Sequence, residues 1–223
     1  MSHAPGRSLL TTTLAADDLK LSTLVDLISA LQARGPCAFA IVCSGRDVLD
    51  KLITGLNQVK DTSVAYLHSD LDQAQRDLTV SQYLVRVRRQ STLSAQNNTI
   101  ASESQPADAL SVQGTPAASA EVLVASDVCL KAFEDEGHPA LKLSLLVNYD
   151  LPAKKDLYAR RIQVVCGTDD TTLSAAIAMY FVTAGQMAQL RAVEGFLGPA
   201  QLEVMPVHVA DILQQTRQSF AAT

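Results

Sequence analysis

The apolar positions of this chain follow two different periods in alternating segments. In residues 17–33, leucine, valine and isoleucine recur at steps of three and four, which is the spacing of an amphipathic helix. Residues 38–43 (AFAIVC) instead form a continuous apolar run, which is typical of a strand buried on both faces. The same two patterns predict further strands at 63–67, 121–125, 143–149 and 176–182, and further helices at about 48–56, 154–165 and 186–196. A capping box formed by Asp72 and Gln75 predicts the start of another helix. Strands that alternate with helices predict right-handed crossovers, and therefore an α/β fold of about five or six mainly parallel strands with helices on both faces.

Two segments lie outside this alternation. We expect residues 1–16 to form an N-terminal tail and residues 17–223 to form a single domain. From about 90 to 120 the chain is rich in Ser, Ala, Gln, Asn, Thr and Pro and has no apolar period. Such a composition buries too little apolar area to offset the entropy of ordering it, which predicts a flexible insertion. Strand patterns on both sides place this insertion within one domain, and a partner-binding segment is the alternative interpretation.

Composition and charge narrow the possible functions. The chain has 223 residues, which suffices for one large domain and falls short of a two-domain nucleotide motor at about 100–200 residues per domain. A net charge of -5, 4% aromatic residues and no Trp argue against unaided binding to nucleic acid. The start of the chain has no signal-peptide pattern, and no run approaches the roughly 18 apolar residues of a membrane span. We therefore expect a protein of the cytoplasm or nucleus that makes no membrane contact.

Cysteine and histidine give no sign of a metal or cofactor site. The four cysteines form no CxxC pair and have no histidine at ligand spacing, so we expect them to be reduced residues of the core. A zinc site or a disulfide framework is the alternative. The histidines show no nucleophile–base or metal-binding spacing. The sequence thus predicts no metal and no cofactor.

Six segments occur in an order and spacing that are together distinctive. They are residues 20–27 (KLSTLVDL), 43–52 (CSGRDVLDKL), 68–77 (HSDLDQAQRD), 122–128 (VLVASDV), 145–152 (LLVNYDLP) and 205–212 (MPVHVADI). Together they resemble the C-terminal RecA-like domain of DEAD-box RNA helicases, in particular the initiation factor 4A branch. The resemblance implies a single RecA-like three-layer domain that closes on a second domain carrying the phosphate loop and the DEAD acid. No GxxxxGK[ST] phosphate loop occurs in this sequence.

The segment that supplies arginine fingers in that family has changed. The family pattern HRIGRxGR aligns with residues 160–167 (RRIQVVCG), where Arg161 is retained. The two later arginines, which face the γ-phosphate in the family, fall on Val164 and Gly167. An arginine finger accelerates phosphoryl transfer by roughly 10³–10⁵-fold, and neither Val nor Gly can replace its charge. Arg161 is then a residual nucleotide-facing residue, or alternatively one half of an ion pair within the domain.

A second nucleotide-facing segment is altered as well. The family pattern TTDxxARGID aligns with residues 125–134 (ASDVCLKAFE) and retains Asp127. Glu134 replaces the acid that meets the adenosine ribose in the family, one methylene further from the backbone. Lys131 and Ala132 replace an Arg-Gly pair beside the RNA, which keeps a charge but loses the bidentate fork of arginine. We expect no ATP binding by this loop.

Candidate RNA-facing residues remain at a few positions. Arg46 matches an arginine of the family, and Gln73 and Arg76 match its QxxR motif near the RNA backbone. Lys131 completes this set. Contacts of such side chains with phosphate are independent of sequence and sensitive to salt.

The hypothesis that we favour at this point is a non-catalytic pseudo-helicase module of RNA metabolism or translation that binds a protein. The resemblance names a partner class, the HEAT-repeat MIF4G domains that grip this half of initiation factor 4A. One alternative is a helicase half that completes an ATP-dependent enzyme in trans. A weak RNA-backbone-binding module and a decayed product without selected function are further alternatives.

Overall fold

A seven-stranded sheet forms the centre of the computed structural model, which describes residues 8–14, 17–100, 119–169, 176–197 and 202–204. The strands are β1 (Ser8–Leu14), β2 (Cys37–Cys43), β3 (Thr62–Leu67), β4 (Ala120–Ser126), β5 (Leu145–Asn148), β6 (Ile177–Thr183) and β7 (Glu203–Val204). Their order is β3-β4-β2-β5-β6-β1-β7, and every pair among these strands is parallel. The predicted parallel α/β fold is therefore confirmed.

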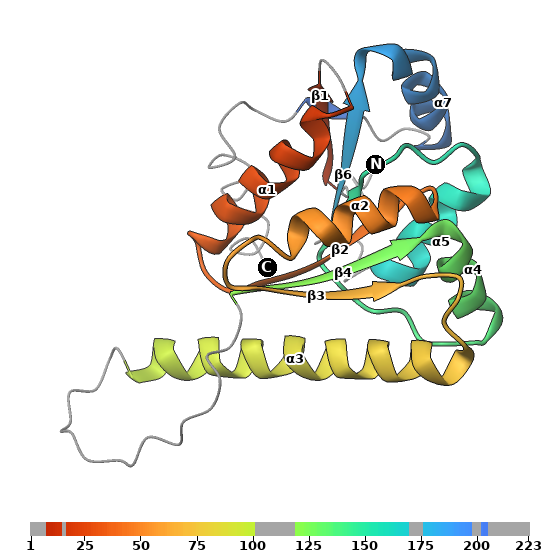
Figure 1. Ribbon diagram of the computed structural model, residues 1–223. Helices are drawn as coiled ribbons and strands as arrows, with labels where there is room; N and C mark the ends of the chain where they lie inside the picture. Colours follow the sequence, from red (N-terminus) through yellow and green to blue (C-terminus); the bar gives the residue numbers. More distant parts are fainter. Residues whose placement is uncertain (1–7, 15–16, 101–118, 170–175, 198–201, 205–223) are drawn as a thin grey trace, which may run out of the picture.

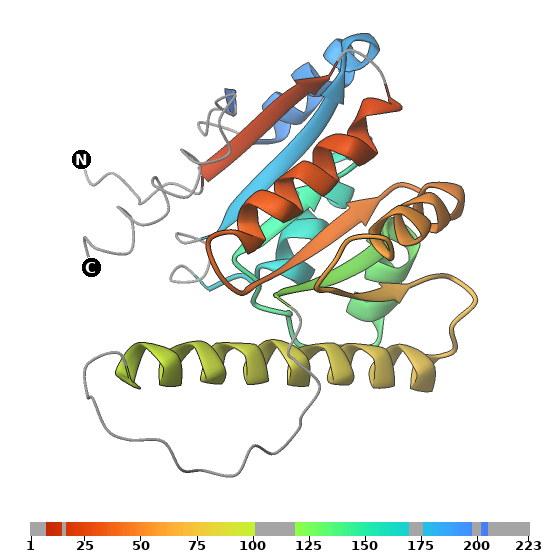
Figure 2. The same cartoon turned by 60° about the vertical axis from the view of Figure 1, so that its left-hand side comes forward.

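Helices cover both faces of this sheet (Figure 1). They are α1 (Leu19–Gln32), α2 (Arg46–Leu56), α3 (Gln73–Ile100), α4 (Asp127–Asp135), α5 (Lys155–Val165), the 3-10 turn η1 (Ala184–Gln186) and α7 (Met187–Leu197). α1 and α2 pack their leucines on one face, against alternate residues of the central strands such as Phe39 and Ile41. α3, α4, α5 and α7 pack on the other face, against the intervening residues such as Ala40 and Val42. Figure 2 shows α1 and α2 on the side of the sheet away from α3.

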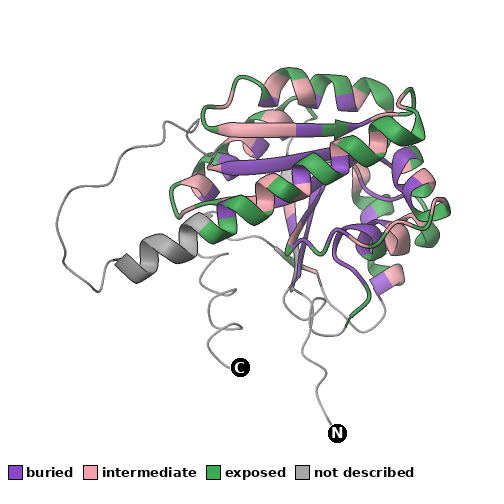
Figure 3. Cartoon of the chain, turned by 90° about the horizontal axis from the view of Figure 1, so that it is seen from below, coloured by how far each residue is buried: buried purple, intermediate pink, exposed green. Residues whose placement is uncertain are grey.

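Two apolar layers, one on each face, make up the core. Every described position of β4 and β6 is buried, as expected for strands covered on both faces. Figure 3 shows buried positions along the strands and exposed positions on the outer sides of the helices. None of the described helices is long and apolar enough to cross a membrane.

The prediction of an N-terminal tail over residues 1–16 is wrong for residues 8–14. Residues 8–14 form β1, which pairs along its whole length with β6, from Ser8 opposite Ile177 to Leu14 opposite Thr183. The segment SLLTTTL is short and four of its seven residues are Ser or Thr, so it shows no long apolar run. Its threonines are β-branched and suit a pleated strand, which is the propensity that prevails here.

The predicted start of the insertion, at about residue 90, is too early because α3 (Gln73–Ile100) extends ten residues beyond it. α3 opens with the predicted capping box, in which the Gln75 backbone N–H donates to Asp72 Oδ1 at 2.8 Å and the Asp72 N–H donates to Gln75 Oε1 at 3.0 Å. The helix then continues to Ile100, because residues 90–100 contain no Gly or Pro that would end it. Gln90 also fixes the helix to the start of β4 through a hydrogen bond from Nε2 to the Ser119 carbonyl. Residues 101–118, the rest of the predicted insertion, lie outside the described residues.

Candidate functional site

The carboxyl ends of β2, β3, β4 and β5 bring the predicted site residues to one edge of the sheet. In open parallel sheets this edge is where ligands bind. Arg46 follows β2, Asp127 follows β4, and Asp150 follows β5. Arg161 reaches the same region from α5. We call this region the strand-end site.

Arg161 is the most constrained side chain of the strand-end site. Its Nε and Nη2 donate to the two carboxylate oxygens of Asp127 at 2.7 and 2.8 Å, and its Nη1 donates to Asn148 Oδ1 and to the Asp150 carbonyl at 3.0 and 2.6 Å. The residue is 1% exposed. The guanidinium thus joins α4, β5 and α5 from the inside, in the ion pair within the domain that the sequence left as an alternative to contact with nucleotide.

A second buried cation lies on the other side of Asp150. Lys20 Nζ, with its side chain 3% exposed, lies 3.5 Å from Asp150 Oδ1 and 3.2 Å from Asp17 Oδ1. It also lies 5.5 Å from the centre of the Tyr149 ring. The Ser44 N–H and hydroxyl both donate to Asp150 Oδ2, at 3.0 and 2.9 Å. Lys20 and Ser44 were not identified as site residues from the sequence. The position of Lys20 among the apolar residues of α1 is the signal that could have indicated a buried, paired lysine.

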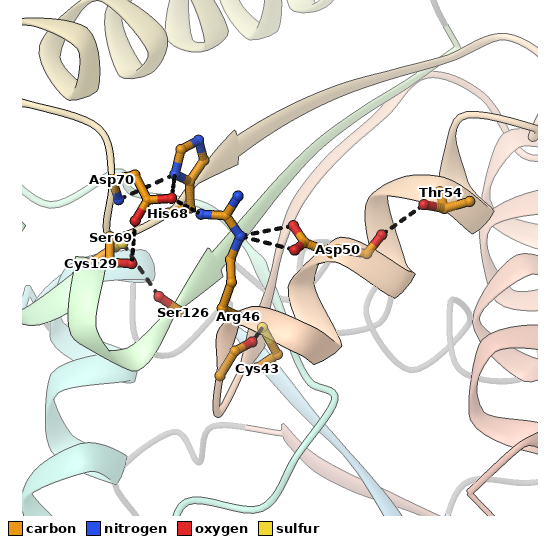
Figure 4. Close-up of polar contacts among 10 residues, drawn as sticks. Cys43, Arg46, Asp50, Thr54, His68, Ser69, Asp70, Ser126 and Cys129 are labelled. Atoms are coloured by element: carbon orange, nitrogen blue, oxygen red, sulfur yellow. Dashed lines mark hydrogen bonds and ion pairs between the residues drawn. The ribbon is translucent and has the colours of Figure 1, made fainter.

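Arg46 lies between two carboxylates at the surface (Figure 4). Its Nε donates to Asp50 on α2 at 2.9 and 3.0 Å, and its Nη1 donates to Asp70 in the β3–α3 loop at 2.7 Å. The Asp70 N–H donates to His68 Nδ1 at 3.3 Å, and the imidazole stacks on Tyr66 with ring centres 5.9 Å apart. Both carboxylates facing Arg46 therefore come from this domain.

The remaining candidate cations are paired in the same way. Arg76 donates from Nη2 to Glu136 and from Nη1 to the Leu71 carbonyl. Lys131 contacts Asp135 one helical turn further along α4. Gln73, at the first position of α3, is exposed.

Glu134 lies apart from the Arg161 cluster. It accepts a hydrogen bond from Arg160 Nε at 2.6 Å, in a pair between α4 and α5, and its side chain is 42% exposed. The structure therefore brings Arg161 and Asp127 together and places Glu134 in a separate surface pair.

The two positions that align with arginine fingers occupy structural roles. Val164 is 6% exposed and belongs to the core beneath α5. Gly167 follows the end of α5 with φ 94°, and its N–H closes the helix on the Gln163 carbonyl at 3.1 Å. A non-glycine residue is strained at such a φ value. An arginine at either position would therefore disturb the packing or the backbone of this domain.

The two cysteines of β2 lie at opposite ends of the strand, with Cys43 at the strand-end site and Cys37 at the far end. Burial, with a further contribution from Asp150, raises the pKa of the Cys43 thiol to about 12. Burial also raises the pKa of Cys37 to about 11. Because the thiolate is the reactive form, a raised pKa lowers the reactivity of both thiols at neutral pH. The four cysteines are free, and Cys43, Cys129 and Cys166 are buried as predicted for core residues, whereas Cys37 is only half-buried.

Known proteins similar to this chain identify its fold and relatives. No family model matches the chain. It is 28% identical over 197 residues to the ATP-dependent RNA helicase eIF4A of Chaetomium globosum and 27% identical to that of Emericella nidulans, alignments that cover 88% of this chain. The chain spans 38% of the length of these relatives.

Solved structures agree with this relationship at the level of the fold. The C-terminal domain of the DEAD-box protein Dbp5 matches with a TM-score of 0.61 at 16% identity, covering 96% of this chain and 98% of that one. The S. cerevisiae Dbp5 C-terminal domain bound to Gle1 and IP6 matches with a TM-score of 0.63 at 17% identity, covering 97% and 99%. E. coli SrmB bound to regulator of ribonuclease activity A matches with a TM-score of 0.61 at 16% identity, covering 90% and 91%. The resemblance to the C-terminal RecA-like domain of DEAD-box helicases is confirmed.

Proposed function

We propose that this chain, as a relative of the C-terminal domains of DEAD-box helicases, is a pseudo-helicase module that binds a protein partner and does not turn over ATP. The observation that carries the proposal is the pairing of its cations. Each positively charged side chain predicted to face nucleotide or RNA is engaged by a carboxylate of the same domain: Arg161 by Asp127, Arg46 by Asp50 and Asp70, Arg76 by Glu136, and Lys131 by Asp135.

Pairing of this kind weakens any interaction with phosphate. A cation that is already neutralised gains little from a phosphate, since the new contact must first displace the internal carboxylate. The net charge of -5 adds long-range repulsion of polyanions. Arg161 would in addition have to leave a buried position, which costs the hydrogen bonds of Asp127 and Asn148.

The positions aligned with arginine fingers support the absence of catalysis. Val164 is a core residue, and Gly167 adopts a backbone conformation that suits glycine. No other described residue of α5 offers a free guanidinium at the strand-end site, because Arg160 contacts Glu134 and Arg161 contacts Asp127. Completion of a helicase in trans would therefore lack its phosphate-facing charge.

Protein binding is supported by exposed apolar side chains on α3 and by the related structures. Leu78 and Val85 are 57% and 62% exposed. They are seven residues apart, so they lie on the same side of the helix. The fold neighbours bound to Gle1 and to regulator of ribonuclease activity A show that this fold serves as a protein-binding domain in those proteins. We propose a helical-repeat partner of the MIF4G type, the class that the sequence resemblance names.

Steady-state ATP hydrolysis with RNA, with and without a purified MIF4G domain, tests the catalytic part of the proposal. We expect no turnover above background in either case. Turnover that disappears in the Lys131→Ala variant would overturn the non-catalytic function and support the alternative of a helicase half acting in trans. Filter binding of RNA at two salt concentrations completes the test. Tight binding with a steep salt dependence would instead support an RNA-backbone module.

Calorimetric titration with the MIF4G domain tests the partner class. We expect binding that is weakened by Leu78→Ser combined with Val85→Ser and retained in the control Val128→Ser. Val128 is equally exposed, at 62%, but lies at the start of another helix, α4. No binding by the folded wild-type chain would overturn the MIF4G assignment. Equal weakening by all three substitutions would overturn the α3 surface.

A further inference from the structure

Three potential metal ligands meet beside the start of α3. His138 Nε2 lies 2.9 Å from Asp77 Oδ1 and 3.2 Å from Glu136 Oε2, and the ligand atoms of all three residues lie within 4.8 Å of one another. Among the described residues this is the only group of three such side chains. We propose that Asp77, Glu136 and His138 bind a divalent transition-metal cation of the zinc type and thereby join α3 to the end of α4. The site is independent of the proposed pseudo-helicase function.

The end of α4 sets the position of two of these ligands. Gly137 has φ 73°, its N–H donates to the Glu134 carbonyl at 3.0 Å, and the His138 N–H donates back to the Phe133 carbonyl at 3.3 Å. This pair of hydrogen bonds is a Schellman motif, which turns the chain sharply after the helix. Because of this turn, Glu136 and His138 face the same side although they are two residues apart.

The imidazole is held in a fixed orientation. His138 stacks on Phe133 with ring centres 4.5 Å apart and an angle of 28° between the rings. This stacking presents Nε2 to the carboxylates of Asp77 and Glu136. A ligand that is already oriented loses little freedom when a cation binds, which favours binding.

The donor atoms suit zinc in type and spacing. Imidazole nitrogen and carboxylate oxygen both bind Zn²⁺ at about 2.0–2.2 Å. Two donors at that distance from a tetrahedral ion lie about 3.4 Å apart. The separations of 2.9 and 3.2 Å from His138 Nε2 are close to that value, and the three donor atoms all lie within 4.8 Å of one another.

Arg76 prepares one ligand for the cation. Its guanidinium contacts Glu136 Oε1, while Oε2 of the same carboxylate faces His138. The guanidinium therefore leaves Oε2 as the oxygen of this carboxylate that is directed toward the other two ligands. Hydrogen bonds to a ligating carboxylate are the usual outer contacts of metal sites and fix the orientation of the ligand.

The accessibility of the cluster allows a cation to enter. The Asp77 side chain is 46% exposed, that of His138 22% and that of Glu136 16%. A three-ligand site of this kind leaves a position for water or for a fourth ligand. Two carboxylates converge on a single imidazole nitrogen, which can donate only one proton, so a cation can satisfy both where hydrogen bonding satisfies one.

Titration of the full chain with Zn²⁺ after treatment with a chelator tests the proposal. We expect one bound equivalent and a rise in the thermal midpoint, since a ligand that binds only the folded state stabilises it. His138→Gln and Asp77→Asn should each weaken binding by more than the roughly 10–100-fold that loss of an outer contact causes. The control His68→Gln removes a histidine that also faces an aspartate, Asp70, and should leave binding unchanged.

Two further measurements keep the result decisive. Circular dichroism of each variant shows whether it is folded, and Glu136→Gln serves if one of the others is not. The absorption spectrum with Co²⁺ in place of Zn²⁺ should show nitrogen and oxygen ligation. A thiolate charge-transfer band would assign the metal to cysteine, and wild-type affinity in folded His138→Gln or no binding by the wild-type chain would equally overturn the proposal.

Discussion

Replacement of Arg161 by methionine should remove a large part of the stability of the domain. The substitution keeps an unbranched apolar stem but deletes a guanidinium that is 1% exposed. It leaves the Asp127 carboxylate, Asn148 Oδ1 and the Asp150 carbonyl without four hydrogen bonds. Breaking a buried ion pair by removing one partner costs about 3–5 kcal/mol. Domains of this kind are stable by about 5–15 kcal/mol, so we expect a large shift of the unfolding midpoint.

Urea unfolding followed by far-ultraviolet circular dichroism measures this change, because the chain has no Trp for fluorescence. The matched control is Arg160→Met on the same helix, where the pair with Glu134 is partly exposed. Exposed pairs contribute about 0–1 kcal/mol, so this variant should remain near the wild type. Combining Arg161→Met with Asp127→Asn should recover part of the loss, since the uncompensated carboxylate is then absent.

The two arginines should therefore differ in their contribution to stability. If Arg161→Met unfolds within about 1 kcal/mol of Arg160→Met, the buried network does not stabilise the fold. Arg161 would then be free to face a ligand, and its assignment as a structural residue would be wrong.

Three other substitutions or reactions test separate features of the structure. Gly167→Ala should lower the unfolding free energy by about 1–2 kcal/mol in urea titrations because φ is 94° there, whereas Gly185→Ala, at a residue with open space around Cβ, should change it little. Cys43 and Cys37, with pKa values of about 12 and 11, should react slowly with Ellman's reagent at neutral pH and rapidly after unfolding, and fast reaction in the folded state would contradict their burial. The hydrogen bond from Arg76 that lowers the pKa of Glu136 stabilises the fold above about pH 4.5, and this contribution is lost as the pH falls through the lowered pKa. With chelator present, Glu136→Gln should therefore flatten the acid limb of the curve of stability against pH. An unchanged acid limb would exclude this contribution.

Much of the fold could be predicted because its signals are local. The apolar runs of β2, β4 and β6 and the three- and four-residue steps of α1 occur where the sequence placed them. The same approach missed β1, because a short threonine-rich segment becomes a strand through its pairing with β6 rather than through its own apolar pattern. It also missed α4, whose nine residues were assigned to a motif instead of a helix.

The candidate site was predicted in part, because its sequence motifs are local signals as well. The motifs identified Arg46, Arg76, Arg161 and Lys131 as candidate site residues, and the resemblance of residues 160–167 to the family pattern predicted that two arginines are missing. A motif, however, carries no information about what a side chain contacts. The pairing of these cations with carboxylates of the same domain became visible only in the structure.

By itself the sequence determined most of the alternation of strands and helices, the relationship to helicase C-terminal domains and the prediction that the arginine fingers are lost, since each depends on adjacent residues. Only the tertiary structure decided whether the remaining cations are available. Arg161 meets Asp127 across 34 positions of the chain and Arg76 meets Glu136 across 60, and His138, just beyond the end of α4, meets Asp77 on α3. Electrostatic and hydrogen-bond energies depend on distances of a few ångströms, which folding sets and sequence separation does not.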